Sequence, residues 1–259
     1  IEEVARNTSK PFWFQLYVMR DHDFAKRLVE RAKAAQCSAL VLTLDLQILG
    51  QRHADIRNGL SIPLKIKLSN LFDLLSKPSW CYQMARTKNR TFGNVMGHVK
   101  DITNLNSLTK WVQDQFDTRL NWDDVKRIKD WWGGKLIIKG IMDPDDAKMA
   151  QKCGADALVV SNHGGRQLDG VNSSISTLPE IKKAVSHMEV LMDGGISSGQ
   201  DILKAIAMGA EGVMIGRSFV YGLSAGGKEG VTKSLEILNK ELDMTMALCG
   251  RRDIKDVGR

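Results

Sequence analysis

The sequence lacks the long apolar runs and paired cysteines that mark membrane-spanning and disulfide-bonded chains. No stretch of about 18 or more apolar residues occurs, so no transmembrane helix is predicted. The 4 cysteines form no CxxC pair, and no His/Cys cluster has the spacing of zinc ligands. We therefore expect reduced thiols, as in a cytosolic protein, and no bound metal.

Positive charge is concentrated in one segment. The formal net charge is +7, and residues 61–110 alone hold eight Lys and Arg against two Asp. A strongly basic chain can indicate a nucleic-acid partner. Because the rest of this chain is almost neutral, we predict no nucleic-acid binding and look for another role for residues 61–110.

Short apolar runs alternate with helical patterns along the chain. Buried runs that alternate with helices indicate a parallel α/β sheet, and repeated βα units are typical of a TIM (β/α)8 barrel. Only about six of the eight βα units of such a barrel are visible, so we expect its N-terminal part to be missing. The predicted strands span residues 12–18, 39–43, 135–139, 157–160, 190–193 and 212–215. The predicted helices span residues 23–35, 121–130, 144–152, 199–208 and 230–248.

The connection between the second and third predicted strands is unusually long. Its roughly ninety residues exceed an ordinary βα connection. We predict a single domain over residues 1–259, with residues 61–110 as a basic insertion loop that leaves the barrel.

The stretch SNHGGRQLDG, residues 161–170, directly follows a buried strand. In a barrel, residues at the carboxyl ends of strands face the active site. His163 can accept a proton near neutral pH, and Arg166 can bind a carboxylate with two hydrogen bonds. Taken alone, the segment also fits a loop histidine flanked by glycines.

This stretch closely resembles the signature of the FMN-dependent 2-hydroxy-acid dehydrogenases and oxidases. The resemblance implies that His163 is the catalytic base and that Arg166 binds the substrate carboxylate. The segments PFWFQLYV, VLTLD, LGQR, IIKG, DGG and IGR resemble other family segments in the same order. They imply Tyr17 and Arg52 as substrate-binding, Asp45 as the partner of His163, and Gln15, Thr43, Lys139, Ser161, Asp193, Gly194, Gly195, Gly216 and Arg217 as binding FMN.

One position departs from the family pattern. Ser197 stands where the family usually has an arginine that helps to bind the flavin phosphate. A serine brings no charge, so we expect phosphate binding to depend more on Arg217 and on backbone amides.

Within the family, FWFQLYVMRD, IIKGIMDPDDA and the long insertion most resemble the bacterial respiratory L-lactate dehydrogenases. The resemblance implies oxidation of L-lactate to pyruvate, FMN as hydride acceptor, a quinone or other respiratory electron acceptor, and a homo-oligomer. It also implies a peripheral position on the cytoplasmic side of the bacterial inner membrane.

The basic insertion agrees with that position, because its cations and the apolar residues 71–75 and Trp80 suit an anionic lipid surface. A solvated lid is the other interpretation of this segment. Three functional alternatives also stay open: a catalytically silent remnant of such an enzyme, a glycolate- or mandelate-oxidising enzyme, and a non-redox phosphate-binding barrel such as an isomerase.

Overall fold

Six parallel strands form one sheet whose order follows the chain, β1-β2-β3-β4-β5-β6. The computed structural model describes residues 1–48, 50, 52–58, 68–87, 92–95, 97–99, 111, 114–115, 117–185 and 187–258. Within these residues the sheet is open, with β1 and β6 at its edges. The strands are β1 (Trp13–Tyr17), β2 (Ala39–Thr43), β3 (Lys135–Ile141), β4 (Ala157–Val160), β5 (Glu189–Met192) and β6 (Gly212–Val213). The predicted parallel α/β sheet is thereby confirmed.

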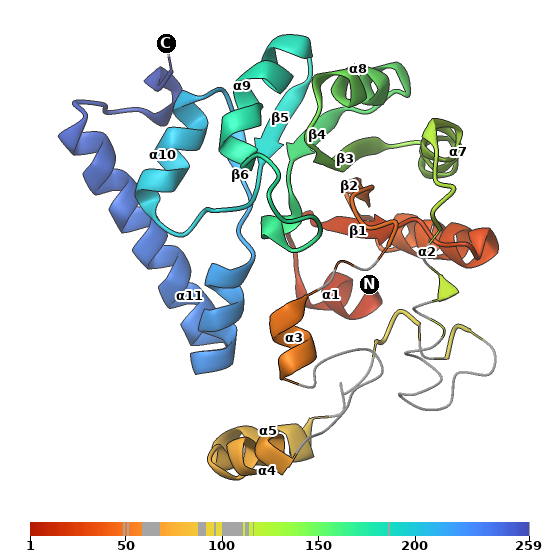
Figure 1. The fold of residues 1–259 in the computed structure, drawn as a ribbon, viewed down its shortest axis with the longest axis vertical. Coiled ribbons are helices and arrows are strands. Elements are labelled where there is room, and N and C mark those ends of the chain that lie inside the picture. Colours follow the sequence, from red (N-terminus) through yellow and green to blue (C-terminus); the bar gives the residue numbers. More distant parts are fainter. Residues whose placement is uncertain are drawn as a thin grey trace.

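Helices connect the strands and lie in an arc outside the sheet (Figure 1). Those around the sheet are α1 (Glu2–Asn7), α2 (His22–Ala34), α7 (Trp122–Trp132), α8 (Pro144–Lys152), α9 (Ser174–Ala184), α10 (Gly199–Ala207) and α11 (Arg217–Leu248). Shorter helical segments are α3 (His53–Arg57), α4 (Leu68–Leu75), α5 (Pro78–Arg86) and the 3-10 turns η1 (His163–Gly165) and η2 (Ile254–Asp256).

The short helices α1, α3, α4 and α5 are not among the predicted ranges, and two longer helices also differ from the sequence-based expectation. Helix α9 was not predicted, because Pro179 lies inside it and its first turn is rich in Ser and Thr, which are poor helix formers. Helix α11 begins well before residue 230, and non-helical backbone at Gly226 and Gly227 divides it. That glycine pair concealed the first half of the helix in the sequence pattern.

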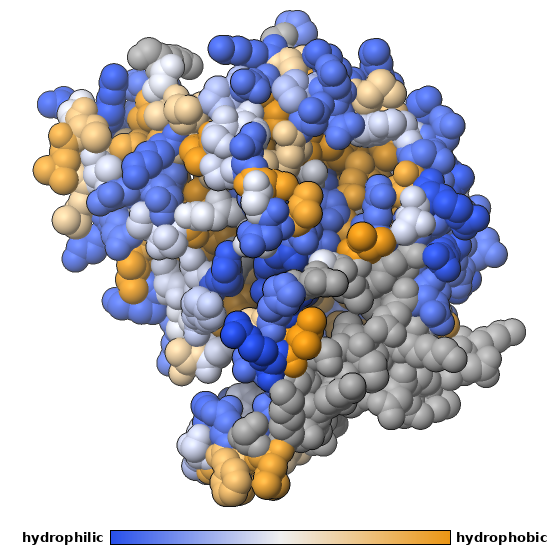
Figure 2. Space-filling view, in the orientation of Figure 1, coloured by the Kyte–Doolittle hydropathy of each residue, from blue (hydrophilic) through white to orange (hydrophobic). Residues whose placement is uncertain are grey.

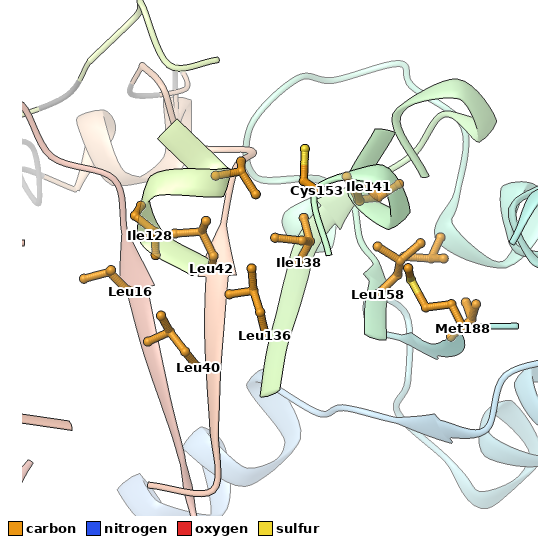
Figure 3. Close-up of a cluster of buried hydrophobic side chains, with 14 of the residues drawn as sticks. Leu16, Leu40, Leu42, Ile128, Leu136, Ile138, Ile141, Cys153, Leu158 and Met188 are labelled. Carbon is orange, nitrogen blue, oxygen red and sulfur yellow. The ribbon is translucent and has the colours of Figure 1, made fainter. Parts of the chain in front are cut away.

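The core follows from the two-residue period of the strands. On β2, Leu40 and Leu42 point to the helices, whereas Ala39 and Val41 belong to a separate cluster on the opposite face. In the helix-facing cluster, large aliphatic side chains of neighbouring strands pack with residues of the covering helices, such as Ile128 of α7 (Figure 3). Because these side chains are fully buried, they fix the register of the strands and therefore the position of every strand end.

Side-chain caps fix where the covering helices begin. The Asp21 carboxylate accepts from the backbone N–H of Phe24 at the start of α2, and Asn121 and Asp124 form a capping box at the start of α7. Pro144 occupies the first turn of α8, where its missing N–H costs nothing. These caps fix the first residue of each helix, and they therefore fix the residue at which the preceding loop ends.

Helices α4 and α5 lie apart from the sheet (Figure 1). They belong to the predicted insertion at residues 61–110, most of whose remaining residues lie outside the described part of the chain. Their apolar side chains are largely exposed, with Phe72 at 67% and Leu75 at 68%. In the described residues, no helix combines the length and the apolar character needed to cross a membrane.

Candidate active site

The predicted site residues gather at the carboxyl ends of the strands, around a cavity of about 800 Å³. Those that line it are Gln15, Tyr17, Lys139, His163, Arg166, Asp193, Gly194, Gly195, Gly216 and Arg217. Thr43, Asp45 and Ser161 stand behind this layer and bond to members of it. Parallel strands in register therefore bring these distant segments to one place.

His163 and Asp45 form a hydrogen-bonded pair. His163 Nδ1 lies 3.0 Å from Asp45 Oδ1, and both side chains are mostly buried. A carboxylate only accepts hydrogen bonds, so Nδ1 carries the proton and the lone pair of Nε2 is free to accept another. The backbone of His163 has φ of 57°, an uncommon conformation for a side-chain-bearing residue, and its N–H donates to Ser161 Oγ at 3.1 Å.

Gly140 makes room for Asp45. A Cβ at Gly140 would lie 2.7 Å from both Cβ and Cγ of Asp45, and the glycine has φ of 100°. It sits where the pairing of β3 with β4 shifts by one residue, between Lys139 and Ile141. Such a bulge redirects the neighbouring side chain. The same glycine thus shapes the positions of Asp45 and Lys139.

Lys139 is a buried cation with two oxygen partners. Its Nζ donates to Ser161 Oγ at 2.8 Å and pairs with Asp193 Oδ2 at 3.0 Å. The other carboxylate oxygen of Asp193, Oδ1, is buried and has no hydrogen-bond partner among the described residues, and the same is true of Asp45 Oδ2. A buried acceptor of this kind calls for a donor, which a polar ligand in the cavity can supply.

Gln15, Thr43 and Tyr17 form a polar group on β1 and β2. Gln15 Nε2 donates to Thr43 Oγ1 at 2.8 Å and to the Tyr17 hydroxyl at 3.1 Å. Burial, followed by the negative charge of Asp45, raises the pKa of Tyr17 above its usual value of 10.0. The Tyr17 hydroxyl consequently stays protonated and keeps one O–H to donate into the cavity.

The two predicted carboxylate-binding arginines occupy different positions. Arg166 lines the cavity, and its Nη2 pairs with Asp55 Oδ2 at 3.4 Å. Arg52 does not line the cavity, and its Nη2 donates instead to Gln167 Oε1 at 3.1 Å, next to Arg166 in the chain. Arg166 therefore has direct access to a ligand in the cavity, and Arg52 stands beside it.

Glycine turns and one arginine also line the cavity. Gly194 and Gly195 have φ of 85° and 80°, and Arg217 Nη2 donates to the carbonyl of Gly164 at 3.2 Å. Ser197 also lines the cavity, but its N–H and hydroxyl both donate to Asp201 Oδ2 at 3.1 Å. The side chain at position 197 is thus committed to the cap of α10.

Sequence reasoning missed three residues that shape this site. Gly140 and Gln167 lie within the quoted IIKG and SNHGGRQLDG segments, but both act through contacts with the segment that follows β2. Asp55, which competes for Arg166, carries no motif at all. No spacing in the sequence reveals such long-range contacts.

Known proteins match this chain over nearly its whole length. The family model described as FMN-dependent dehydrogenase matches residues 1–259. An L-lactate dehydrogenase of Haemophilus influenzae (strain PittEE) is 44% identical over 259 residues, which are 99% of this chain and 68% of that protein. An L-lactate dehydrogenase of Actinobacillus pleuropneumoniae serotype 5b (strain L20) is 43% identical over 261 residues, and the match covers 100% of this chain and 68% of that protein.

Solved structures of the same family share the fold. The monotopic membrane protein (S)-mandelate dehydrogenase superposes with a TM-score of 0.92 at 34% identity, covering 99% of this chain and 68% of its own. A mandelate oxidase superposes with a TM-score of 0.78 at 35% identity, covering 100% and 65%. These are barrel enzymes, so the predicted TIM-barrel class is confirmed, with a 6-stranded sheet in the part of this chain that the structure describes. The chain belongs to the FMN-dependent dehydrogenase family.

Proposed function

We propose that this chain binds FMN and oxidises an L-2-hydroxy acid, with L-lactate as the substrate and pyruvate as the product. The observation that carries the proposal is the convergence of three groups on one cavity. They are the His163 imidazole backed by Asp45, the Arg166 guanidinium and the buried Lys139 ammonium. A base, a carboxylate-binding cation and a cation for a reduced cofactor are what this oxidation requires.

The residues around the cavity suit FMN. The volume of about 800 Å³ lies within the range of cofactor sites. The Lys139 ammonium has three N–H groups and two partners, so it can donate one hydrogen bond to a polar ring edge. Asp193 Oδ1 offers an unused acceptor to the hydroxyls of a ribityl chain. Gly195 and Gly216 have open space beside their Cα atoms, and with Arg217 they would hold the phosphate.

The chain's own residues account for binding and proton transfer. Arg166 would bind the substrate carboxylate, and the Tyr17 hydroxyl would donate a hydrogen bond to it. His163 Nε2 would accept a proton from the substrate, and the carboxylate of Asp45 would stabilise the imidazolium that forms. The substrate loses two electrons and two protons in becoming a 2-oxo acid. FMN, when bound, would accept the two electrons together with one proton, and His163 would hold the other proton until solvent takes it.

L-lactate is favoured over other hydroxy acids by the relatives. The curated proteins named above are L-lactate dehydrogenases at 43% and 44% identity, whereas the mandelate enzymes are 34% and 35% identical. The test is anaerobic mixing of the FMN-loaded chain with L-lactate, D-lactate, glycolate or L-mandelate. We expect L-lactate to bleach the flavin band fastest. Faster bleaching by L-mandelate or glycolate would transfer the assignment to that acid.

The role of His163 is tested by His163→Gln. Glutamine fills a similar space but accepts no proton near neutral pH, so the flavin should stay bound while reduction by substrate nearly stops. The matched control is His187→Gln, because His187 is exposed and outside the cavity. Equal reduction rates in the two variants would remove His163 as the base.

We also propose that residues 61–110 hold the enzyme at an anionic membrane surface, where a quinone would accept its electrons. Apolar side chains gather at the tip formed by α4 and α5 (Figure 2), where Leu68, Phe72 and Leu75 are exposed. Arg86 lies in the last turn of α5, and Lys77, which pairs with Asp73, precedes the same helix. An unpaired cation contributes about 1 kcal/mol near an anionic surface. A relative of the same fold is described as a monotopic membrane protein.

Vesicle co-sedimentation tests this second proposal. The double variant Phe72→Ser/Leu75→Ser should lose binding to vesicles that contain phosphatidylserine. The control Leu235→Ser removes a similarly exposed leucine from α11 and should bind as the unaltered chain does. Unchanged co-sedimentation of the double variant would contradict membrane contact through this segment.

A further inference from the structure

Two loops that carry the proposed chemistry lie directly on one another. One follows β2 and holds Asp45 and Arg52, and the other follows β4 and holds His163 and Arg166. A Cβ at Gly50 would lie 2.6 Å from the carbonyl oxygen of Gln167, so backbone meets backbone here. Such close contact leaves little freedom for either loop to shift alone.

The side chain of Gln167 joins these loops at three points. Its Nε2 donates to the carbonyl oxygens of Asp45, at 3.2 Å, and Ile48, at 3.3 Å. Its Oε1 accepts from Arg52 Nη2 at 3.1 Å. The orientation of the amide follows from chemistry, because carbonyl oxygens only accept and a guanidinium only donates.

From this bonding we infer that Gln167 is a positioning residue for the oxidation, an inference that rests on the proposed function. Its hydrogen bond to the Asp45 carbonyl fixes the Asp45 backbone, so that the Asp45 carboxylate lies 3.0 Å from His163 Nδ1. It also holds the guanidinium of Arg52 beside Arg166, whose own carbonyl lies 3.5 Å from Arg52 Nε. One carboxamide thereby aligns the base and its carboxylate partner with the anion-binding arginines.

Two substitutions of Gln167 separate the effect of its hydrogen bonds from the effect of a charge at this position. Gln167→Glu keeps an oxygen for Arg52 but replaces the Nε2 donor with an oxygen that faces two carbonyl acceptors. It also places a fixed negative charge beside Arg52, where the substrate anion would bind. Gln167→Met keeps the length of the side chain and removes all three hydrogen bonds. Gln151→Glu and Gln151→Met are the matched controls, because Gln151 is exposed on α8.

The kinetic experiment uses FMN-loaded protein and normalises every rate to bound flavin. For both Gln167 variants we expect kcat/KM for L-lactate to fall about 10- to 100-fold, the loss that accompanies removal of a hydrogen bond to a charged group. The KM should rise in Gln167→Glu more than in Gln167→Met, since only the former adds a competing charge. If Gln167 merely supported folding, its variants would yield less flavin-loaded protein, but the KM for L-lactate of that protein would be unchanged.

Titration with oxalate provides a readout that does not need turnover. Oxalate is a planar dianion that can occupy an arginine-lined site, and its binding is followed by the flavin spectrum. We expect about 10-fold weaker oxalate binding in both Gln167 variants and unchanged binding in both Gln151 variants. Gln167 variants that match the unaltered chain in oxalate affinity and in kcat/KM would overturn the inference.

The same titration separates the inference from the proposed function. If the unaltered chain binds oxalate but L-lactate does not reduce its flavin, the proposed substrate is wrong, while the oxalate affinities still decide the role of Gln167. If the unaltered chain binds no oxalate, no aligned anion site exists, and the inference fails together with the proposed function.

Discussion

Replacing Gly140 with alanine should disturb both the stability of the sheet and the position of Asp45. At φ of 100°, a residue with a side chain is strained by about 1–3 kcal/mol. The new methyl group would also lie 2.7 Å from Asp45 Cβ and Cγ, closer than non-bonded carbons approach, and overpacking of this kind costs about 1–3 kcal/mol. We expect Gly140→Ala to lower the free energy of unfolding by about 2–6 kcal/mol.

Gly133→Ala is the matched control for that experiment. Gly133 ends α7 with φ of 67°, and a Cβ there meets nothing within 4 Å. Its replacement carries backbone strain alone, about 1–2 kcal/mol, and lies away from the cavity. Denaturant unfolding gives both free energies, and anaerobic mixing with L-lactate gives the rates of flavin reduction. The rate should fall in Gly140→Ala and stay unchanged in Gly133→Ala. Equal destabilisation with unchanged reduction in both variants would refute the claim that Gly140 makes room for Asp45.

Three further predictions concern charged pairs. Asp45→Asn should slow flavin reduction by about 10²–10⁴-fold, because an amide does not stabilise the imidazolium at 3.0 Å; a stopped-flow rate within about twofold of the unaltered chain would contradict the pairing. Asp55→Asn should lower the KM for L-lactate by up to about fivefold, since it removes a partly exposed carboxylate that competes for Arg166; an unchanged or higher KM would speak against that competition. The Arg31 guanidinium lowers the pKa of Glu2 from 4.5 to about 2, so the ionised Glu2 stabilises the fold above pH 4.5 and this contribution is lost as the pH falls towards 2. Glu2→Gln should therefore reduce the free energy of unfolding by about 1 kcal/mol or less at pH 7, because the pair is partly exposed. The reduction should be much smaller at pH 2, and unfolding curves at both pH values measure the difference.

The strands were the most predictable part of the fold. Residues 39–43 and 157–160 are fully buried runs with clear ends, and the structure forms β2 and β4 over the same residues. β3 is longer than predicted, because it continues through Gly140, which sequence reasoning treats as a strand end. Glycine has this double character because it ends regular strands but also permits bulges within them.

The family resemblance located most residues of the candidate site, but not the hydrogen bonds that hold those residues in place. His163, Arg166 and Lys139 stand at strand ends in recognisable segments, so a motif could find them. Gln167 stands within the same motif, yet its role depends on carbonyl oxygens of another loop. A backbone acceptor exists at every residue, so the sequence does not indicate which of them a given side chain meets.

The proposed function is tested most directly by the visible spectrum of the purified chain after addition of FMN and desalting, recorded before and after anaerobic addition of L-lactate. We expect the chain to retain a flavin band that L-lactate bleaches and D-lactate does not. A retained band that no 2-hydroxy acid bleaches would contradict the proposed oxidation, and the absence of a retained band would contradict FMN binding by the residues of this chain.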